Sequence, residues 1–232
     1  MSDSNRDMVT KVAHRLGPLR EEVVFVGGAT TELLLTRPVI YDVRITKDVD
    51  VIVGVINRND YYRFAERLRE RGFLEASEPG NPICRWKVDD LLVDVMPTEE
   101  SILGFSNRWY PEAIRNAMEY PLEDDLPIRL VAPLFFLTTK FEAFRGRGNN
   151  DLYTSHDIED ILTLLDGRPE IIDEFEACSH DLRTALAGYF SQLKSHPDFE
   201  YVIAGQFPSD AVGRARSSEL IQLIEVISRG TI

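Results

Sequence analysis

Hydrophobic and polar positions follow two different patterns along the chain, and the first half of it is typical of strands alternating with helices. Short apolar runs rich in β-branched residues predict strands at "EEVVFVGG", "KDVDVIVGVI" and "PIRLVA". The runs "ICRWKV" and "LLVDVM" are joined by Asp89-Asp90 and predict a hairpin. Helices are predicted at "ATTELLL" and at "NDYYRFAERLRERG", where apolar residues recur at helical spacing until Gly72.

From Pro133 onward the apolar spacing is mainly helical. It predicts a helix at "LFFLTTKFEAF" and another at "SHDIEDILTLLDG", where Ser155 can cap the first turn. Two further helical segments are expected, from Pro169 to about Lys194 and from about Ser217 to Ser228. We therefore predict an α+β (mixed α/β) fold, with a small mixed sheet flanked by helices in residues 1–131 and a helical lobe in residues 132–232.

Composition narrows the class of protein. The chain of 232 residues can bury a core without a disulfide or metal staple. Its formal net charge of −13 argues against a broad basic surface for nucleic acid, since phosphate contacts need clustered Lys and Arg. Small basic patches occur at "AFRGRG" and "SNRWYPEAIR", but each has only two arginines, and a solvated face also explains them.

The sequence gives no sign of a membrane or of an oxidising compartment. No window approaches the length of an apolar membrane span, and the polar N-terminus lacks the apolar segment of a secretory signal. Cys84 and Cys178 are too few for a disulfide framework. We expect a cytoplasmic protein without a membrane partner.

Asp48 and Asp50 stand at the start of an apolar, β-branched run. Because side chains alternate along a strand, both carboxylates point to one face and the neighbouring valines to the other. Two like charges 4 Å apart repel by about 4 kcal/mol at an effective dielectric constant near 20. A bound Mg²⁺ or Mn²⁺ would offset this repulsion. The alternative is a hydrated strand mouth with Arg44 and Lys47 as partners.

Asp94 is a third acid between aliphatic residues, in "LLVDVM". If its strand lies beside the first one, its carboxylate faces Asp48 and Asp50 across about 5 Å and completes a metal-binding set. The alternative for Asp94 is a charge at the exposed end of an edge hairpin.

Gly27-Gly28 lies between a predicted strand and a predicted helix. Glycine there lets the backbone approach a ligand, and Thr30 and Thr31 in the next turn could add hydroxyl donors. A tight turn explains the pair equally well, because it matches neither a dinucleotide-binding GxGxxG nor a Walker A sequence.

The order of these motifs resembles the nucleotidyltransferase superfamily, which has a polymerase-beta-like fold. The resemblance rests on "FVGGATTELLL", "TKDVDVIV" and "LLVDVM", and it covers about the first hundred residues. The later segments "LTTKFEAFRGRG" and "SHDIEDILTLLDGRPE" resemble the helical lobe of the AbiEii/MenT-like toxin branch. The resemblance implies a catalytic lobe in residues 1–131 and a helical lobe in residues 132–232 that completes the nucleotide site.

The resemblance also implies a role for individual residues. One departure is the spacing of nineteen residues between Gly28 and Asp48, through "RPVIYDVRIT", which we interpret as a surface insertion. The implied roles are metal binding by Asp48, Asp50 and Asp94, activation of the acceptor hydroxyl by Asp94, a triphosphate cradle of Gly27, Gly28 and Thr30, phosphate contact by Lys140, and nucleotide binding by Asp157, with Asp160 as a second candidate.

Lys140 and Asp157 each have an ordinary explanation as well. Lys140 can be a snorkelling lysine in an apolar helix, and Asp157 can be a first-turn acid that favours the helix dipole. His156-Asp157 also invites comparison with metal phosphohydrolases, but the other histidines, His14, His180 and His196, lack matching context.

The function predicted from these motifs is metal-dependent transfer of NMP from an NTP such as ATP to a hydroxyl acceptor. The resemblance implies an RNA acceptor, the 3′ end of tRNA, in a toxin of a toxin–antitoxin or phage-defence module with a cognate antitoxin. A protein hydroxyl is the alternative acceptor. A non-catalytic nucleotide-binding or partner-binding protein of the same fold, and a glycosyltransferase that uses Asp-x-Asp for a nucleotide sugar, are the competing functions.

Overall fold

The computed structural model describes residues 4–55, 57–78, 80–147 and 151–230. The chain forms two compact units. The first contains the residues up to Leu33 together with Ile45–Thr139, and the second contains Leu34–Arg44 together with the residues from Lys140 onward. The division falls within one helix, α5 (Pro133–Gly146). The functional boundary between residues 131 and 132 stays a prediction.

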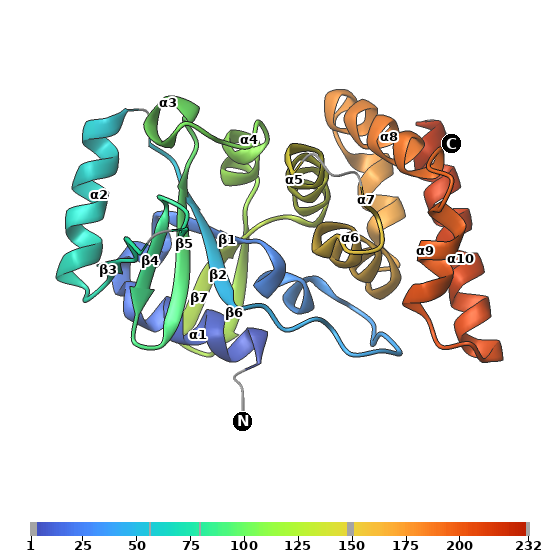
Figure 1. Ribbon diagram of the computed structural model, residues 1–232, viewed down its shortest axis with the longest axis horizontal. Helices are drawn as coiled ribbons and strands as arrows, with labels where there is room; N and C mark the ends of the chain where they lie inside the picture. The colour runs from blue at the N-terminus through green and yellow to red at the C-terminus, as the bar shows by residue number, and fades with distance from the viewer. Residues whose placement is uncertain (1–3, 56, 79, 148–150, 231–232) are drawn as a thin grey trace. The chain divides into compact units, whose positions relative to one another are not determined.

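The first unit is built on a mixed sheet whose strands run in the order β3-β4-β5-β2-β1-β7-β6 (Figure 1). β2 lies between β1, which is antiparallel to it, and β5, which is parallel to it. This arrangement confirms the predicted fold class and the predicted hairpin, which is β4 and β5. The strands are β1 (Val23–Val26), β2 (Asp48–Val53), β3 (Leu74–Glu75), β4 (Arg85–Val88), β5 (Leu91–Pro97), β6 (Met118–Glu123) and β7 (Leu126–Leu130).

Alternation along β2 and β5 separates the core from the acids. Val49 and Val51 on β2 are opposite Val93 and Val95 on β5, and all four are fully buried. The residues between them point to the other face of the sheet, because the side-chain period of a strand is two. Burial of the valines therefore fixes the direction of the carboxylates of β2 and β5.

Helices cover the sheet of the first unit. α1 (Asn5–Leu16) lies against it and contacts β2, β5 and β7 (Figure 1). The polar N-terminal sequence did not indicate α1, although Ser4 and Asp7 form a capping box at its start. The predicted helix after β2 is confirmed, with Tyr61, Phe64, Ala65 and Leu68 buried. It is α2 (Arg58–Glu70), and the chain continues through α3 (Glu100–Leu103) and α4 (Tyr110–Arg115).

The prediction of an α-helix at "ATTELLL" is wrong. The segment forms two 3₁₀ turns, Gly28–Thr30 and Glu32–Leu34. Its residues are buried on nearly every side, so it lacks the single apolar stripe that stabilises a surface helix.

The segment after these turns is a loop, and nearly all residues of 37–46 are exposed or half-buried, as expected for a surface insertion. Within the second unit, Thr36 and Arg37 donate their backbone N–H groups to the carbonyl of Gly167. Arg37 Nε donates to the carbonyl of Asp166 at 2.6 Å, and the Tyr41 hydroxyl donates to Asp166 Oδ2 at 3.2 Å. Long-range hydrogen bonds therefore hold Leu34–Arg44 onto the helical unit.

The second unit is helical. Ser155 caps α6 as predicted, but the expected segment from Pro169 to Lys194 is two helices, because Ser179 caps a new one. The last helix starts earlier than Ser217, and α9 was not predicted. The helices are α6 (His156–Gly167), α7 (Ile171–Ala177), α8 (His180–Lys194), α9 (Phe199–Gln206) and α10 (Ala211–Arg229). In the described part of the chain, no helix is long and apolar enough to span a membrane.

Candidate functional site

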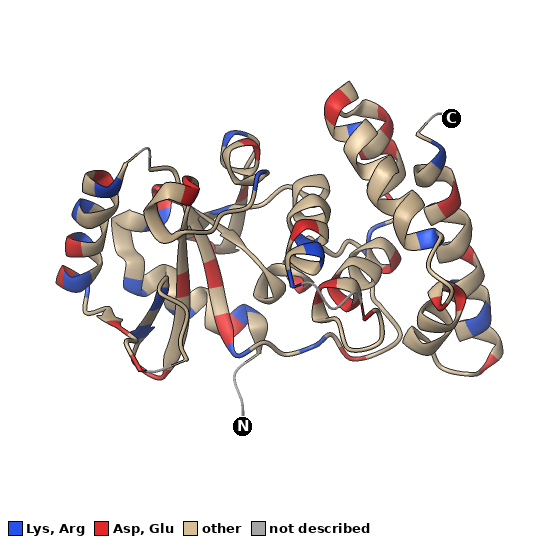
Figure 2. Ribbon diagram, turned by 45° about the horizontal axis from the view of Figure 1, so that its top comes forward, with Lys and Arg blue, Asp and Glu red and all other residues tan. Residues whose placement is uncertain are grey.

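The predicted acids Asp48, Asp50 and Asp94 lie on one face of two adjacent strands. In the register of β2 and β5, Asp50 is directly opposite Asp94, and Asp48 precedes Asp50 by one full period of the strand. Figure 2 shows acidic positions on the strands of the sheet. Asp48 and Asp50 are half-buried and Asp94 is buried. Together with Arg85 we call these residues the sheet cluster.

Arg85 bridges two of the three acids. Its Nε and Nη2 atoms donate to Asp94 Oδ1 and Oδ2, both at 2.8 Å, and Nη2 also donates to Asp48 Oδ2 at 2.5 Å. The hydrogen bond to Asp94 raises the pKa of the guanidinium further above its ordinary value, so Arg85 is a permanent cation. Sequence reasoning missed Arg85.

Gly27 is required by the position of Asp50. Gly27 has a φ of +76°, which favours glycine, and an added Cβ would lie 1.9 Å from Asp50 Oδ2. The register of β1 and β2 pairs Val26 with Asp50, so the glycine follows the residue opposite this acid. Gly27 thus makes room for the carboxylate of Asp50, and Gly28 begins the next turn.

The buried side chain of Thr30 stabilises this turn through a hydrogen bond. Its Oγ1 donates to the carbonyl of Gly27 at 2.8 Å, and the side chain is fully buried. The hydroxyl of Thr31 is also buried and has no hydrogen-bond partner among the described residues. The cradle of Gly27, Gly28 and Thr30 for a triphosphate stays a prediction.

The donor atoms of the sheet cluster fit a hard divalent cation, since Mg²⁺ and Mn²⁺ prefer carboxylate oxygens. With Arg85 Nη2 on both Asp48 and Asp94, however, no three His, Cys, Asp or Glu side chains of the described residues stand in a metal-binding group. The carboxylates therefore suit a cation in their chemistry, and in this structure Arg85 Nη2 lies between Asp48 and Asp94.

Lys140 and Asp157 meet in the second unit, in a group that we call the helical cluster. Lys140 Nζ donates to Asp157 Oδ1 at 3.3 Å and to Asp160 Oδ2 at 2.6 Å. Arg44 Nη2 donates to both oxygens of Asp160, at 3.1 and 2.8 Å, and Arg147 Nε lies 3.2 Å from Asp157 Oδ2. Asp157 and Asp160 thus neutralise the Lys140 ammonium group within the second unit, which explains how this lysine can be buried.

The helical cluster changes two expectations. Arg44, which the sequence suggested as a partner for Asp48 and Asp50, pairs with Asp160. Asp160, a secondary candidate, makes the shorter contact with Lys140. The predicted roles of Lys140 and Asp157 toward a nucleotide are not tested by these contacts.

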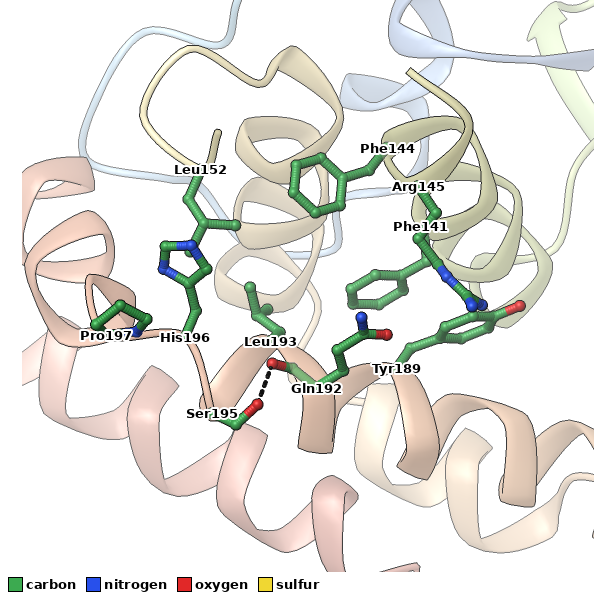
Figure 3. A pocket seen from close by; sticks show the side chains of 10 residues that line it. All are labelled: Phe141, Phe144, Arg145, Leu152, Tyr189, Gln192, Leu193, Ser195, His196 and Pro197. Carbon is green, nitrogen blue, oxygen red and sulfur yellow. Dashed lines mark hydrogen bonds between the residues drawn. The ribbon is translucent and has the colours of Figure 1, made fainter. Parts of the chain in front are cut away.

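The second unit also contains an aromatic cavity of about 290 Å³ (Figure 3). Phe141 and Tyr189 stack there with ring centroids 5.1 Å apart, and the Arg145 guanidinium lies 5.7 Å from the centre of the Tyr189 ring. None of the predicted site residues lines this cavity. Its lining consists of Phe141, Phe144, Arg145, Leu152, Tyr189, Gln192, Leu193, Ser195, His196 and Pro197.

Comparison with known proteins relates the chain to solved structures. No family model matches the sequence, and no curated protein matches it. An antigenic nucleotidyltransferase-like protein from Paracoccidioides brasiliensis is 22% identical with a TM-score of 0.53, over 87% of this chain and 92% of its own. The antibiotic-resistance factor ANT(2'')-Ia is 16% identical with a TM-score of 0.51, over 84% of this chain and 98% of its own. The chain therefore has a nucleotidyltransferase-like fold.

Proposed function

We propose that the protein is a metal-dependent nucleotidyltransferase that moves NMP from an NTP to a hydroxyl group and releases pyrophosphate. The observation that carries the proposal is the convergence of Asp48, Asp50 and Asp94 on one face of β2 and β5. It is supported by Gly27, whose backbone makes room for Asp50, and by the fold shared with a nucleotidyltransferase-like protein.

The chain's own residues suit this reaction. Asp48 and Asp50 would hold Mg²⁺ or Mn²⁺, with Asp94 completing the set in a two-metal arrangement. The cation, when bound, neutralises charge on the phosphates. Asp94 accepts a hydrogen bond from the acceptor hydroxyl and orients its oxygen for the bond to the α-phosphorus. The hydroxyl proton then passes to water as pyrophosphate leaves.

The roles of the remaining residues belong to the same proposal. The backbone of Gly27 and Gly28, together with Thr30, cradles the triphosphate. Lys140 and Asp157 contribute to nucleotide binding, as the resemblance to the AbiEii/MenT-like branch implies. Removing the Lys140 ammonium should therefore weaken NTP binding in addition to any loss of stability.

For the acceptor we propose an RNA 3′ end, that of tRNA, in a toxin whose activity a cognate antitoxin restrains. The support is the resemblance of "LTTKFEAFRGRG" and "SHDIEDILTLLDGRPE" to the toxin branch. The net charge of −13 allows only a small local contact with RNA. A protein hydroxyl is the alternative. Because ANT(2'')-Ia is named as an antibiotic-resistance factor, antibiotics that carry hydroxyl groups are a third class to assay.

The test is incubation of the protein with each α-³²P-labelled NTP and Mg²⁺ or Mn²⁺, in the presence of total tRNA, cell protein, hydroxyl-bearing antibiotics, or none of these. We expect label on one acceptor class and none with Asp50→Asn. The matched control is Asp124→Asn, which removes the same charge from an exposed position of the β6–β7 turn. Absence of any labelled acceptor, or equal labelling by Asp50→Asn and wild type, would overturn the proposal.

A further inference from the structure

Arg85 occupies an unusual place between two of the predicted metal ligands. It comes from β4 and reaches across β5 to β2, so one guanidinium ties three adjacent strands together. Its contact with Asp94 is a two-bond fork, whereas its contact with Asp48 is a single bond from Nη2. The side chains of Arg85 and Asp94 are 17% and 11% exposed, and that of Asp48 is 29% exposed.

Electrostatics explain why a cation is needed there at all. Three carboxylates on one sheet face repel each other, and the repulsion is strong where water is partly excluded. A guanidinium keeps its charge at any ordinary pH, and its fork matches the geometry of a carboxylate. Arg85 supplies this positive charge to Asp48 and Asp94 in the present structure.

We propose, on the basis of the function proposed above, that Arg85 is a built-in counter-ion of the sheet cluster that competes with the divalent cation. Before a cation binds, Arg85 holds Asp48 and Asp94 together on the sheet. When a cation binds, the Arg85–Asp48 bond is exchanged for a metal–Asp48 bond, while the fork to Asp94 stays.

The structure gives a reason for this order of exchange. Asp48 is the more exposed acid and is held by one bond of Arg85, whereas Asp94 is the less exposed acid and is held by two. Each carboxylate oxygen has two lone pairs, so the oxygens of Asp94 can accept from Arg85 and still face a cation. Arg85 is therefore a positioning residue for Asp94 and a competitor at Asp48.

The first test measures Mn²⁺ binding by electron paramagnetic resonance with no NTP present. We expect Arg85→Met to lower the Kd at least about fivefold, because it removes a positive charge and frees Asp48. Arg85→Lys keeps the charge without the fork and should lie between Arg85→Met and wild type. Arg15→Met is the matched charge control, since Arg15 pairs with Asp89 at an exposed site of the same unit, and it should leave the Kd unchanged.

An unchanged or higher Kd in Arg85→Met would overturn the proposal, because Arg85 would then only position the acids. Adding Asp48→Asn to Arg85→Met should abolish the gain, and persistence of the gain would place the Mn²⁺ elsewhere and equally overturn the proposal.

A second measurement uses the wild-type protein, in case Arg85→Met does not fold. The side-chain N–H signals of Arg85 are assigned in ¹⁵N NMR spectra by their loss in Arg85→Lys. On addition of Mg²⁺ we expect the Nη signals to shift or broaden and the Nε signal, bonded to Asp94, to keep its position. Unchanged Nη signals at saturating Mg²⁺ would contradict the exchange. Neither measurement needs NTP or acceptor, so failure of this inference is distinct from absence of nucleotide transfer.

Discussion

The sheet cluster and the helical cluster contain the same kinds of side chain in a different balance. In the sheet cluster, Arg85 contacts Asp48 and Asp94, and Asp50 lies beside Asp94 on the same face. In the helical cluster, cations from two segments of the chain surround two acids. They are Lys140, Arg44 and Arg147 around Asp157 and Asp160.

The acids of the two clusters also differ in how deeply they are buried. The side chains of Asp157 and Asp160 are only 3% exposed, whereas that of Asp48 is 29% exposed. A buried charge is costly unless protein groups neutralise it, so the helical cluster is balanced internally. Asp48 of the sheet cluster is more accessible, so a cation from solvent can reach it. We therefore expect mutations in the sheet cluster to change metal binding and catalysis. Mutations in the helical cluster should mainly change stability, with weaker NTP binding as well where Lys140 or Asp157 is replaced.

The largest expected effect is loss of nucleotide transfer in Asp50→Asn. Loss of the metal contribution, worth several kcal/mol in the transition state, corresponds to about a thousandfold lower rate. The free energy of unfolding should stay within about 1 kcal/mol of wild type, because Asp50 is half-buried and its repulsion with Asp94 is removed at the same time. Initial rates with labelled NTP and urea unfolding curves check both parts. A stable Asp50→Asn protein with full activity would contradict the assignment.

The next effect is a loss of stability in Asp160→Ala. The substitution leaves Lys140 and Arg44 without their shared acid in a buried site, and breaking a buried ion pair costs about 3–5 kcal/mol. The matched variant Asp48→Ala removes a half-exposed acid and should cost no more than about 1 kcal/mol. Urea unfolding of both proteins measures the difference. Equal destabilisation by the two substitutions would remove the distinction between the clusters.

A smaller effect is expected for alanine at Gly27, and the same substitution at Gly72 distinguishes the cost of backbone strain from an effect on the cation site. Gly27→Ala and Gly72→Ala both place a side chain at positive φ, which costs about 1–2 kcal/mol. An added Cβ meets Asp50 Oδ2 only at Gly27, while nothing lies within 4 Å at Gly72. We expect a larger loss of stability in Gly27→Ala than in Gly72→Ala, because the added Cβ also displaces Asp50, and we expect weaker Mn²⁺ binding only in Gly27→Ala. If both variants bind Mn²⁺ like wild type, the packing of Gly27 on Asp50 is not needed for the site.

The smallest effect concerns the two cysteines. Burial, and after it the charge of Asp94, raises the pKa of the Cys84 thiol to about 12. Cys178 is more exposed, and burial raises the pKa of its thiol as well. Because the thiolate is the reactive form, iodoacetamide at pH 8 should alkylate Cys178 faster than Cys84. Peptide mass spectrometry over time measures this ratio, and alkylation of Cys84 at the same rate would show that the core around β4 opens readily.

Periodicity predicted the parts of the site that depend on neighbouring residues within a strand. The alternation of valine and aspartate in "DVDVIV" was enough to place Asp48 and Asp50 on one face. The position of Arg85 opposite Asp94 could also have been predicted from the sequence. Counting back from the Asp89-Asp90 turn pairs Val88 with Leu91, and the same count pairs Arg85 with Asp94.

Other features depend on contacts between distant segments, which periodicity does not contain. The packing of Leu34–Arg44 depends on hydrogen bonds to the end of α6, more than a hundred residues later. The partner of Arg44, Asp160, is separated from it by a similar distance along the chain. The α-helix predicted at "ATTELLL" was therefore wrong, whereas the loop after it was predicted without its contacts with α6.

The most direct test of the account is a map of where Mn²⁺ binds in the folded protein. Substoichiometric Mn²⁺ is added to ¹⁵N-labelled wild-type protein, and paramagnetic broadening of backbone amide signals is followed. We expect broadening that is strongest in β2, in β5 and at Gly27-Gly28, compared with other signals of the first unit and with a control that contains Mg²⁺ instead. Absence of selective broadening in β2 and β5 would contradict the claim that the sheet cluster is the cation site.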